Sequence, residues 1–378
     1  MTHLTIQDKM ERFSCSRSST KSRQLSPSKT EKYKIHKLHK EFHTIKDTIR
    51  EGSFAKVMIV HRDEQATLVR YAAKFLHRGE GEAEEVYEHR ALTEFDIARD
   101  LHHPNIVEIV SLCKHKSRLA FVMEYCEHSD LLDLMDRNSL RCVDKKCLFK
   151  QMLRGVAYMH SYGIAHHDTK PENMVLADDS VPKIIDFCLS QVFADLLPPK
   201  DNTGKIELGP VRTFAPRIRG TQAYLPPEIL GGSDHYDARA LDVWSCGVTA
   251  FILFAESPPW DEASAEDKRY LAFQKGWQYI LKKYPELPVT GDIFPYVRFV
   301  NALPEKELVT VLLRMLHPLP DKRMTIFEAL EDPWVRAIEC CSPEFNLLST
   351  TRGAKAGDCV ILKRHDHRPP KDKLARSD

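Results

Sequence analysis

Apolar residues follow two different spacings along the chain, and the spacing changes near residue 130. Before that point, short runs rich in β-branched and aromatic residues predict five strands, within 42–49, 55–62, 68–76, 107–116 and 119–125. A segment with helical spacing, 83–101, interrupts these runs. This region is therefore predicted to form a small, mostly antiparallel sheet with one main helix.

Beyond residue 130 the apolar residues recur at i, i+3 and i+4. This spacing predicts helices within 131–135, 146–161, 238–254, 267–283, 305–316 and 326–338. A smaller strand-rich region followed by a larger helical region is typical of an α+β fold.

The two ends of the chain lack such periodicity. Residues 1–42 are rich in Ser, Thr, Lys and Arg and contain few aromatic residues, which predicts a disordered, basic, Ser-rich extension. Residues 339–378 are polar, basic and contain proline, which predicts a largely disordered tail.

Charge is balanced overall but unevenly placed. The chain has 55 Lys and Arg against 54 Asp and Glu, a net charge of +1, which argues against a globally basic nucleic-acid-binding protein. Residues 1–42 carry +6 and residues 345–378 carry +4, so the body between them carries −9. The basic N-terminal segment suits weak contact with an anionic membrane surface, and a solvated linker is the alternative.

The 10 cysteines are scattered and form no dense framework, and the chain does not start with an apolar secretory segment. Both features indicate free thiols in a reducing compartment, and hence a cytoplasmic protein. Cys142 and Cys147 have the spacing of half a zinc site. No second pair with metal-ligand spacing accompanies them, so zinc is not expected from the sequence.

The densest chemistry lies in residues 164–173, Ile-Ala-His-His-Asp-Thr-Lys-Pro-Glu-Asn. Asp168, Lys170 and Asn173 supply a base, a cation for phosphate and a metal ligand within one short loop. Asp186 follows at the end of an apolar run. Carboxylate and amide oxygens are ligands that Mg²⁺ accepts, so Asn173 and Asp186 are predicted to hold Mg²⁺ against nucleotide phosphates.

Features that precede this loop in the sequence are compatible with nucleotide binding, but each one alone is a weaker signal. Gly52 and Ala55 place small residues in a hairpin where a backbone could approach phosphates, although a plain turn explains them equally well. Lys74, on a predicted strand, could pair with Glu94 on the predicted helix and direct its ammonium toward phosphates.

These motifs, followed by residues 220–228 and 242–247, resemble in order the signature set of the eukaryotic protein kinases. The resemblance covers about residues 43–338. It implies a bilobal fold, with a β-rich N-lobe at about 43–125 and a helical C-lobe at about 126–338. Lys170 and Thr221 are similar to those of serine/threonine kinases rather than tyrosine kinases.

Several stretches, among them TEFDIARDLHHPNIVE, FKQMLRGVAYMHSYGIAH and EDPWVRAIECC, look like the fungal halotolerance kinases, which also regulate nutrient permeases. That resemblance implies a serine/threonine kinase that uses ATP and Mg²⁺ and acts on proteins, possible targets being plasma-membrane ion or nutrient transporters.

The resemblance also implies residue roles. Lys74, paired with Glu94, would bind the α- and β-phosphates, Asp168 would accept or orient the substrate hydroxyl, and Lys170 would steady the γ-phosphate. Asn173 and Asp186 would bind Mg²⁺. The nucleotide-binding set would be Gly52, Ser53, Ala55, Val57, Ala72, Met123 as gatekeeper, Glu124 and Cys126 in the hinge, and Val175.

Two further pairs carry more specific expectations. Glu228 and Arg323 would brace the C-lobe, or form an ordinary surface ion pair. Asp130 and Glu172 would select arginine three residues before the target hydroxyl, making the kinase basophilic. Alternatively, Asp130 is a helix N-cap and Glu172 a routine part of its turn.

Three positions depart from the family pattern: Arg50 replaces a loop glycine, His167 an arginine, and Cys188 a glycine. A buried histidine is usually neutral, which puts control by a phosphorylated activation segment in doubt. Cys188 is expected to be a buried, inert thiol or, alternatively, a redox-sensitive one. These departures keep a second hypothesis open, a pseudokinase scaffold that binds partners with little catalysis.

Overall fold

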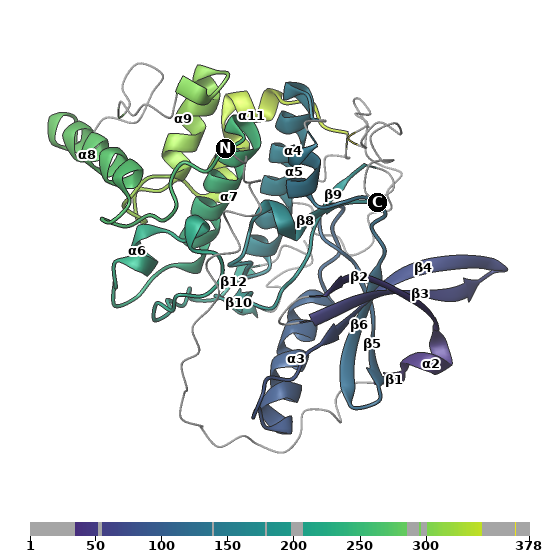
Figure 1. The fold of residues 1–378 in the computed structure, drawn as a ribbon. Coiled ribbons are helices and arrows are strands. Elements are labelled where there is room, and N and C mark those ends of the chain that lie inside the picture. Colours follow the sequence, from purple (N-terminus) through teal and green to yellow (C-terminus); the bar gives the residue numbers. More distant parts are fainter. Residues whose placement is uncertain are drawn as a thin grey trace, which may run out of the picture. The chain divides into compact units, whose positions relative to one another are not determined.

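The computed structural model of the chain describes residues 35–51, 55–137, 140–177, 180–197, 207–285, 295, 301–341 and 367. These residues divide into two compact units between Glu127 and His128. We call the unit before this division the N-lobe and the unit after it the C-lobe. Strands dominate the first and helices the second, which confirms the predicted α+β fold (Figure 1).

The N-lobe contains a six-stranded sheet in the order β1-β5-β6-β4-β3-β2. The strands are β1 (His36–Lys37), β2 (His43–Glu51), β3 (Ala55–Glu64), β4 (Thr67–Leu76), β5 (Ile109–His115) and β6 (Arg118–Glu124). β1 is parallel to β5, and every other neighbouring pair is antiparallel. The five predicted strands are all present, and β1 is an additional one.

Alternate residues of the sheet face two different hydrophobic clusters, as the two-residue period of a strand requires. On β6, Ala120 and Val122 belong to one cluster, whereas Leu119 and Phe121 belong to the other. The second cluster includes residues of α3 (Glu84–Ala98), the single long helix of this lobe, which lies along the sheet in Figure 1. The predicted helix thus covers one face of the predicted sheet.

Ordered structure in the N-lobe begins before residue 43. β1 is followed by the short helix α2 (Leu38–Glu41), and the side chains of Leu38 and Phe42 are 0% and 2% exposed. The prediction of disorder through residue 42 therefore does not hold for residues 35–42. Leu38 and Phe42 stand among basic residues, so the composition of the segment did not reveal them. Their spacing of four positions places them on the same side of a helical turn.

The C-lobe is built from eight helices in the part of the chain that the structure describes. They are α4 (Leu131–Asp136), α5 (Cys142–Ser161), α6 (Pro227–Leu230), α7 (Ala238–Ala255), α8 (Lys268–Lys283), α9 (Lys306–Met315), α10 (Ile326–Glu331) and α11 (Pro333–Ala337). Two 3₁₀ turns are also present, η2 (Pro171–Asn173) and η3 (Gln222–Tyr224).

Three short antiparallel strand pairs complete this lobe. They are β7 (Ile164–Ala165) with β10 (Gln191–Val192), β8 (Met174–Leu176) with β9 (Pro182–Ile184), and β11 (Leu196–Leu197) with β12 (Glu207–Leu208). One predicted helix, 326–338, is instead the two helices α10 and α11. Pro333 starts α11, and the Asp332 side chain caps it by accepting from the backbone N–H of Trp334 at 3.0 Å.

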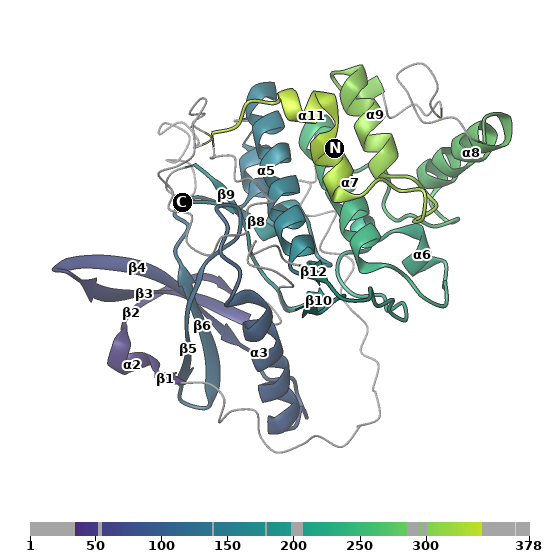
Figure 2. The same cartoon turned by 180° about the vertical axis from the view of Figure 1, so that it is seen from behind.

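Helix α7 forms the centre of the C-lobe and lies between α5 and α9 (Figure 2). It has the length and apolar composition of a membrane-crossing helix, but 83% of that stretch is buried inside the lobe, as expected of a core helix. Trp244 on α7 stacks on Trp260 with ring centroids 5.5 Å apart. A Cβ atom on Gly247 would lie 2.9 Å from the Leu316 side chain, so glycine permits close approach to the end of α9.

Candidate catalytic site

A buried ion pair links the sheet and the helix of the N-lobe. Lys74 on β4 and Glu94 on α3 are 8% and 5% exposed, and the Lys74 Nζ donates to Glu94 Oε1 at 2.6 Å. The pairing expected from the sequence is present. Each side chain compensates the buried charge of the other, and removing one would leave an uncompensated buried charge. The pair therefore holds the Lys74 ammonium in one position.

Three of the proposed nucleotide-binding residues are neighbours in the N-lobe sheet. Val57 on β3 lies opposite Lys74, and Ala72 on β4 lies opposite Met123 on β6. Glu124, at the end of β6, is fastened to Glu108: its carboxylate accepts from the backbone N–H of Glu108 at 2.7 Å, and its own N–H donates to the carbonyl of Glu108 at 3.0 Å. The sheet register therefore aligns residues predicted from distant parts of the sequence.

The structure describes only some of the remaining nucleotide-binding residues. Ala55 begins β3 and is half-buried, and Cys126 is half-buried after β6. Gly52 and Ser53 lie outside the described residues. Arg50, which replaces a loop glycine, belongs to β2 and pairs with Val57, so this position is extended backbone that any residue can adopt.

In the C-lobe, Asp168 is the centre of a compact polar group. Its Oδ2 lies 3.0 Å from the Lys170 Nζ and accepts from the Asn173 Nδ2 at 2.8 Å. Lys170 also donates to the Thr221 Oγ1 at 3.1 Å, which connects the loop to a segment 51 residues away. Burial alone would lower the pKa of Lys170, but the charges of Asp168 and Glu172 raise it above its usual value, so the ammonium remains charged.

Asn173 and Asp186 are brought close by the β8–β9 hairpin. Asn173 directly precedes β8, and its carbonyl accepts from the N–H of Ile185, the residue before Asp186, at 2.9 Å. Because the Asn173 amide nitrogen donates to Asp168, the amide oxygen is oriented away from that carboxylate. One amide oxygen and one carboxylate are hard donors of the kind Mg²⁺ takes, so these residues fit the ion predicted for them.

A residue that the sequence did not assign to any role holds this loop in place. Asp242 on α7 is 0% exposed; its Oδ2 accepts from the His166 N–H at 2.8 Å and its Oδ1 from the His167 N–H at 2.7 Å. The His160 Nε2 also lies 2.9 Å from Oδ2. Burial would raise the pKa of Asp242, but the His160 hydrogen bond and the neighbouring imidazoles hold it below its usual value. Only the fold brings α5, the loop and α7 together around this carboxylate.

A family model described as "Protein kinase domain" matches residues 43–335. The chain belongs to the protein kinase family. The kinase signature motifs in the sequence and the strand-rich and helical lobes of the structure agree with this assignment.

Curated relatives are fungal kinases at low identity. Serine/threonine-protein kinase HAL4/SAT4 of Saccharomyces cerevisiae is 30% identical over 78% of this chain and 46% of its own length. Serine/threonine-protein kinase PRR2 of the same yeast is 32% identical over 77% of this chain and 42% of its own length. The nitrogen permease reactivator protein, also from that yeast, is 30% identical over 71% of this chain and 36% of its length. The chain thus spans less than half the length of these relatives.

The kinase C-lobe contains a second buried ion pair. The Arg323 Nη1 and Nη2 donate to the two carboxylate oxygens of Glu228 at 2.7 and 3.0 Å, and both side chains are buried. Arg323 also donates to the carbonyl of Ala240 at 2.8 Å, and its guanidinium lies 4.8 Å from the centroid of the Trp244 ring. The pair braces the lobe, and the alternative of an ordinary surface pair is wrong.

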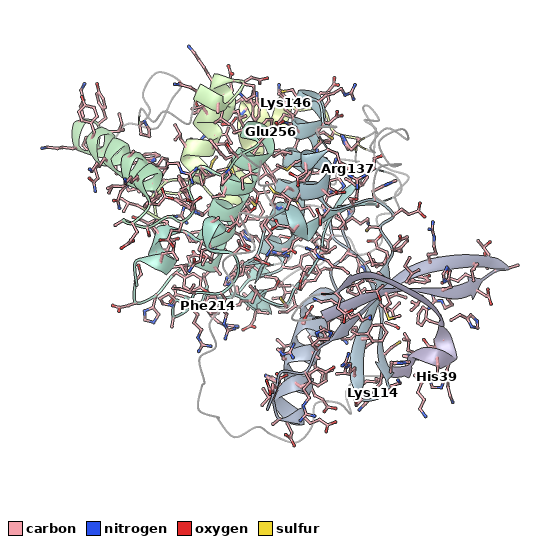
Figure 3. The ribbon with its side chains drawn as sticks, viewed as in Figure 1. His39, Lys114, Arg137, Lys146, Phe214 and Glu256 are labelled. Atoms are coloured by element: carbon pink, nitrogen blue, oxygen red, sulfur yellow. The ribbon has the colours of Figure 1, made fainter. Side chains whose placement is uncertain are left out.

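His167 lies in an aromatic pocket rather than among charges. The centroid of its ring lies 5.7 Å from that of Tyr236 and 6.4 Å from that of Phe214, the residue labelled in Figure 3. The His167 Nε2 has no hydrogen-bond partner among the described residues. Burial lowers the pKa of His167 to about 4, so the imidazole is neutral near pH 7. A neutral ring packed on two aromatic side chains cannot act as the cation that an arginine would supply here.

Cys188 differs from the main expectation for it. The thiol is exposed, not buried, and its backbone N–H donates to the Asp186 Oδ1 at 3.3 Å. Positive φ at this turn falls on Asp186, at 68°, and not on Cys188. The glycine that Cys188 replaces is therefore not required by the backbone of this conformation.

Asp130 and Glu172, the proposed specificity pair, are near enough for the Asp130 charge to act on the Glu172 carboxyl. The Asp130 carboxylate caps α4 by accepting from the Asp133 N–H at 3.0 Å, so the N-cap interpretation of Asp130 is confirmed. Glu172 is half-buried, and its buried Oε2 has no hydrogen-bond partner among the described residues. Burial raises the pKa of Glu172, although the Lys170 charge opposes this.

Proposed function

We propose that this chain is an active protein serine/threonine kinase that transfers the γ-phosphoryl group of Mg-ATP to Ser or Thr hydroxyls of proteins. The observation that carries the proposal is the Asp168 carboxylate, held by both Lys170 and Asn173 in a loop that Asp242 anchors. A scaffold without catalysis has no need for a base positioned by two separate contacts.

In this proposal the chain contributes position and charge. Bound Mg-ATP supplies the transferable phosphoryl group and the cation that neutralises it. Asp168 orients the substrate hydroxyl and accepts its proton, while the Lys170 ammonium balances the charge that develops during transfer. Asn173 and Asp186 would hold the cation, and Lys74, fixed by Glu94, would hold the α- and β-phosphates. Fixed positions supply most of the rate because the reacting groups no longer have to find each other.

Phosphate transfer from radiolabelled ATP to a generic protein substrate tests the proposal. The wild-type chain should transfer label, Asp168→Asn should lose it, and Asp234→Asn, which changes an exposed aspartate of the same lobe, should retain it. The rival function, a pseudokinase scaffold, is favoured by the neutral His167 and the altered Cys188. It predicts that ATP raises the unfolding temperature of the wild-type chain while no label is transferred.

The proposed substrates are basic peptides with arginine three residues before the hydroxyl. Support comes from Glu172, a buried carboxyl that lacks a hydrogen bond at Oε2, and from the acidic group of Asp130, Asp133 and Asp136 near α4. Burial is the largest cause of the raised pKa of both Glu172 and Asp136, and nearby carboxylates add to it, so an incoming guanidinium would be attracted by the field of those carboxylates. A positional-scanning peptide library that selects acidic residues or a following proline would contradict this preference.

The cellular role is proposed from the printed names of the relatives. One of them is a nitrogen permease reactivator, so we propose that the chain is a cytoplasmic kinase that regulates plasma-membrane ion or nutrient transporters. Its basic segment, residues 1–42, would add weak attraction to an anionic leaflet, on the order of 1 kcal/mol per basic residue near the surface. Sedimentation with anionic vesicles of the full chain and of a form without residues 1–34, which keeps β1 and α2, tests the attraction. Equal sedimentation of the two forms would leave a plain linker.

A further inference from the structure

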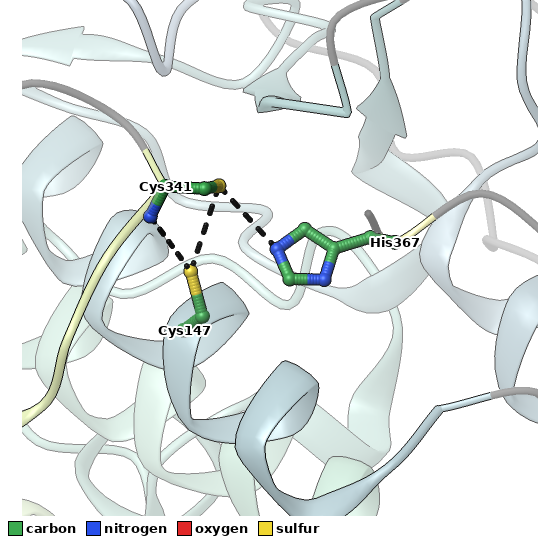
Figure 4. Close-up of side chains that lie close together, drawn as sticks. All are labelled: Cys147, Cys341 and His367. Atoms are coloured by element: carbon green, nitrogen blue, oxygen red, sulfur yellow. Dashed lines mark hydrogen bonds between the residues drawn. The ribbon is translucent and has the colours of Figure 1, made fainter. Parts of the chain in front are cut away.

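Three metal-binding side chains that are far apart in the sequence meet at the N-terminal half of α5. They are Cys147, Cys341 and His367, which are 0%, 7% and 2% exposed. The two sulfur atoms are 3.7 Å apart, and the Cys341 Sγ lies 3.4 Å from the His367 Nε2 (Figure 4). All three ligand atoms lie within 4.8 Å of one another.

We propose that these three side chains bind one Zn²⁺ ion. Tetrahedral zinc holds sulfur at about 2.3 Å and imidazole nitrogen at about 2.0–2.1 Å, which places two sulfurs about 3.8 Å apart and a sulfur and a nitrogen about 3.5 Å apart. The observed separations of 3.7 and 3.4 Å match both values. Thiolate and imidazole are also the ligands of choice for this ion.

The surroundings of His367 orient its ring for a metal. Its Nδ1 lies 3.3 Å from the Asp144 Oδ1, on the side of the ring away from the sulfurs. Asp144 is 2% exposed and is itself held by Arg141, whose Nε and backbone N–H donate to its Oδ2 at 2.8 and 3.1 Å. The two groups lie beside each other as an ion pair, and a carboxylate beside the outer nitrogen of a metal-binding histidine recurs around protein-bound zinc.

The sulfur atoms are likewise placed among donors. The Gln151 Nε2 donates to both sulfurs at 3.2 Å, and the Cys341 backbone N–H lies 3.4 Å from the Cys147 Sγ. These hydrogen bonds fix the positions of the two sulfurs. Gln151 is 0% exposed, so its amide points at the sulfurs from within the core.

Two of the ligands are prepositioned by contacts that do not involve His367. The buried Lys150, on the same helix as Cys147, donates from its Nζ to the carbonyls of Arg336 and Ile338, each at 2.9 Å. These bonds fix the chain that leads from α11 to Cys341 against α5. The ion would then fasten residue 367 to this prebuilt pair, and its fourth position is left to solvent.

The zinc content of the purified full-length chain tests the proposal, measured by elemental analysis after gel filtration in the presence of added zinc. Wild type should retain about one ion per chain, as a tetrahedral site of this kind requires. Cys147→Ser and His367→Ala should each lose it. Their matched controls, Cys142→Ser on the same helix and His365→Ala in the same tail, should keep it, and so should Asp186→Ala, which removes a proposed Mg²⁺ ligand.

Cobalt substitution gives a readout of the ligands themselves. The wild-type chain should develop a thiolate-to-cobalt absorption band that is absent from Cys147→Ser, and circular dichroism should show that the variant remains folded. The proposal is overturned if wild type binds no zinc, if the controls lose the ion together with the ligand variants, or if mass spectrometry finds Cys147 and Cys341 joined in a disulfide in its place.

Discussion

The catalytic loop and the sulfur–imidazole cluster lie in the same lobe but use opposite donors. The loop collects oxygen atoms from Asp168, Asn173 and Asp186, which are close together in the sequence. The cluster collects two sulfurs and an imidazole nitrogen from positions up to 220 residues apart. Hard and soft donors select different cations, so the proposed Mg²⁺ and Zn²⁺ sites of this lobe favour different ions.

The largest expected effect separates the two sites by activity. Asp186→Ala removes a carboxylate from the oxygen site, and phosphoryl transfer should fall by about two to three orders of magnitude, the scale of a lost electrostatic group. Steady-state rates with a protein substrate measure the fall, and zinc content should not change. Near wild-type transfer by this variant would show that Asp186 has no part in the chemistry.

The next effect separates the two sites by stability. Cys147→Ser should remove the zinc contribution to folding, about 3 kcal/mol when free zinc is 100 times its dissociation constant. Urea unfolding of wild type and variant, each with and without zinc, measures this difference. Phosphoryl transfer per folded molecule should stay within about twofold of wild type. If zinc stabilises both proteins equally, the cluster is not its binding site.

A third prediction concerns His167, which belongs to the catalytic loop and whose ring Nε2 has no hydrogen-bond partner in the part of the chain that the structure describes. Its folded pKa of about 4 lies below the value of 6.5 for a free histidine, so the unfolded chain binds more protons between these values. Stability should therefore fall as pH drops through this window, by about 2 kcal/mol at pH 5. Asn tolerates the positive φ of 68° at this position, so His167→Asn is the suitable variant.

Urea unfolding at pH 7.5 and pH 5 compares the two proteins. Wild type should lose more stability than His167→Asn between these pH values. An equal loss would mean that the ring is protonated in the folded chain. The same experiment on His317→Asn serves as a comparison, because burial lowers the pKa of His317 to about 4 as well.

The smallest effect concerns substrate choice. Changing both Asp130 and Glu172 to alanine should reduce selectivity for arginine about tenfold, the order of one charge-assisted hydrogen bond, and leave ATP affinity unchanged. Selectivity of the wild-type chain should also weaken as pH falls, because the raised pKa of Glu172 brings protonation of that carboxyl closer to neutral pH. Peptide pairs with and without the arginine provide the measurement.

How well the sequence predicts a contact depends on how far apart in the chain the two residues stand. Strands and helices follow from local spacing, and the residues of the catalytic loop stand within 6 positions of one another, from Asp168 to Asn173. Lys74 and Glu94 were paired correctly because the family pattern connects a strand to the next helix. Pro333 also signals a break, but the continuous apolar spacing around it concealed the division between α10 and α11.

Contacts across long separations could not be predicted. Asp242 was visible only as part of a motif, and its bonds to the catalytic loop depend on how α5 and α7 pack. The sequence offered no reason to expect zinc because the proposed partners of Cys147 are not neighbours in the chain: Cys142 is exposed, and Cys341 and His367 lie 194 and 220 residues further on. Ligand spacing in the sequence detects compact metal sites, not those assembled by tertiary structure.

The short β1–α2 element determines how far this kinase domain can be shortened at its N-terminal end. β1 pairs with β5, which would otherwise be the outer strand of the sheet, and Leu38 and Phe42 fill the cluster beneath it. A protein expressed from residue 43, where the family match begins, would expose unpaired backbone groups of β5 and an uncovered apolar surface. Such an open strand is a template for pairing between molecules. The protein that starts at residue 43 should therefore aggregate, whereas one that starts at residue 34 should stay in solution.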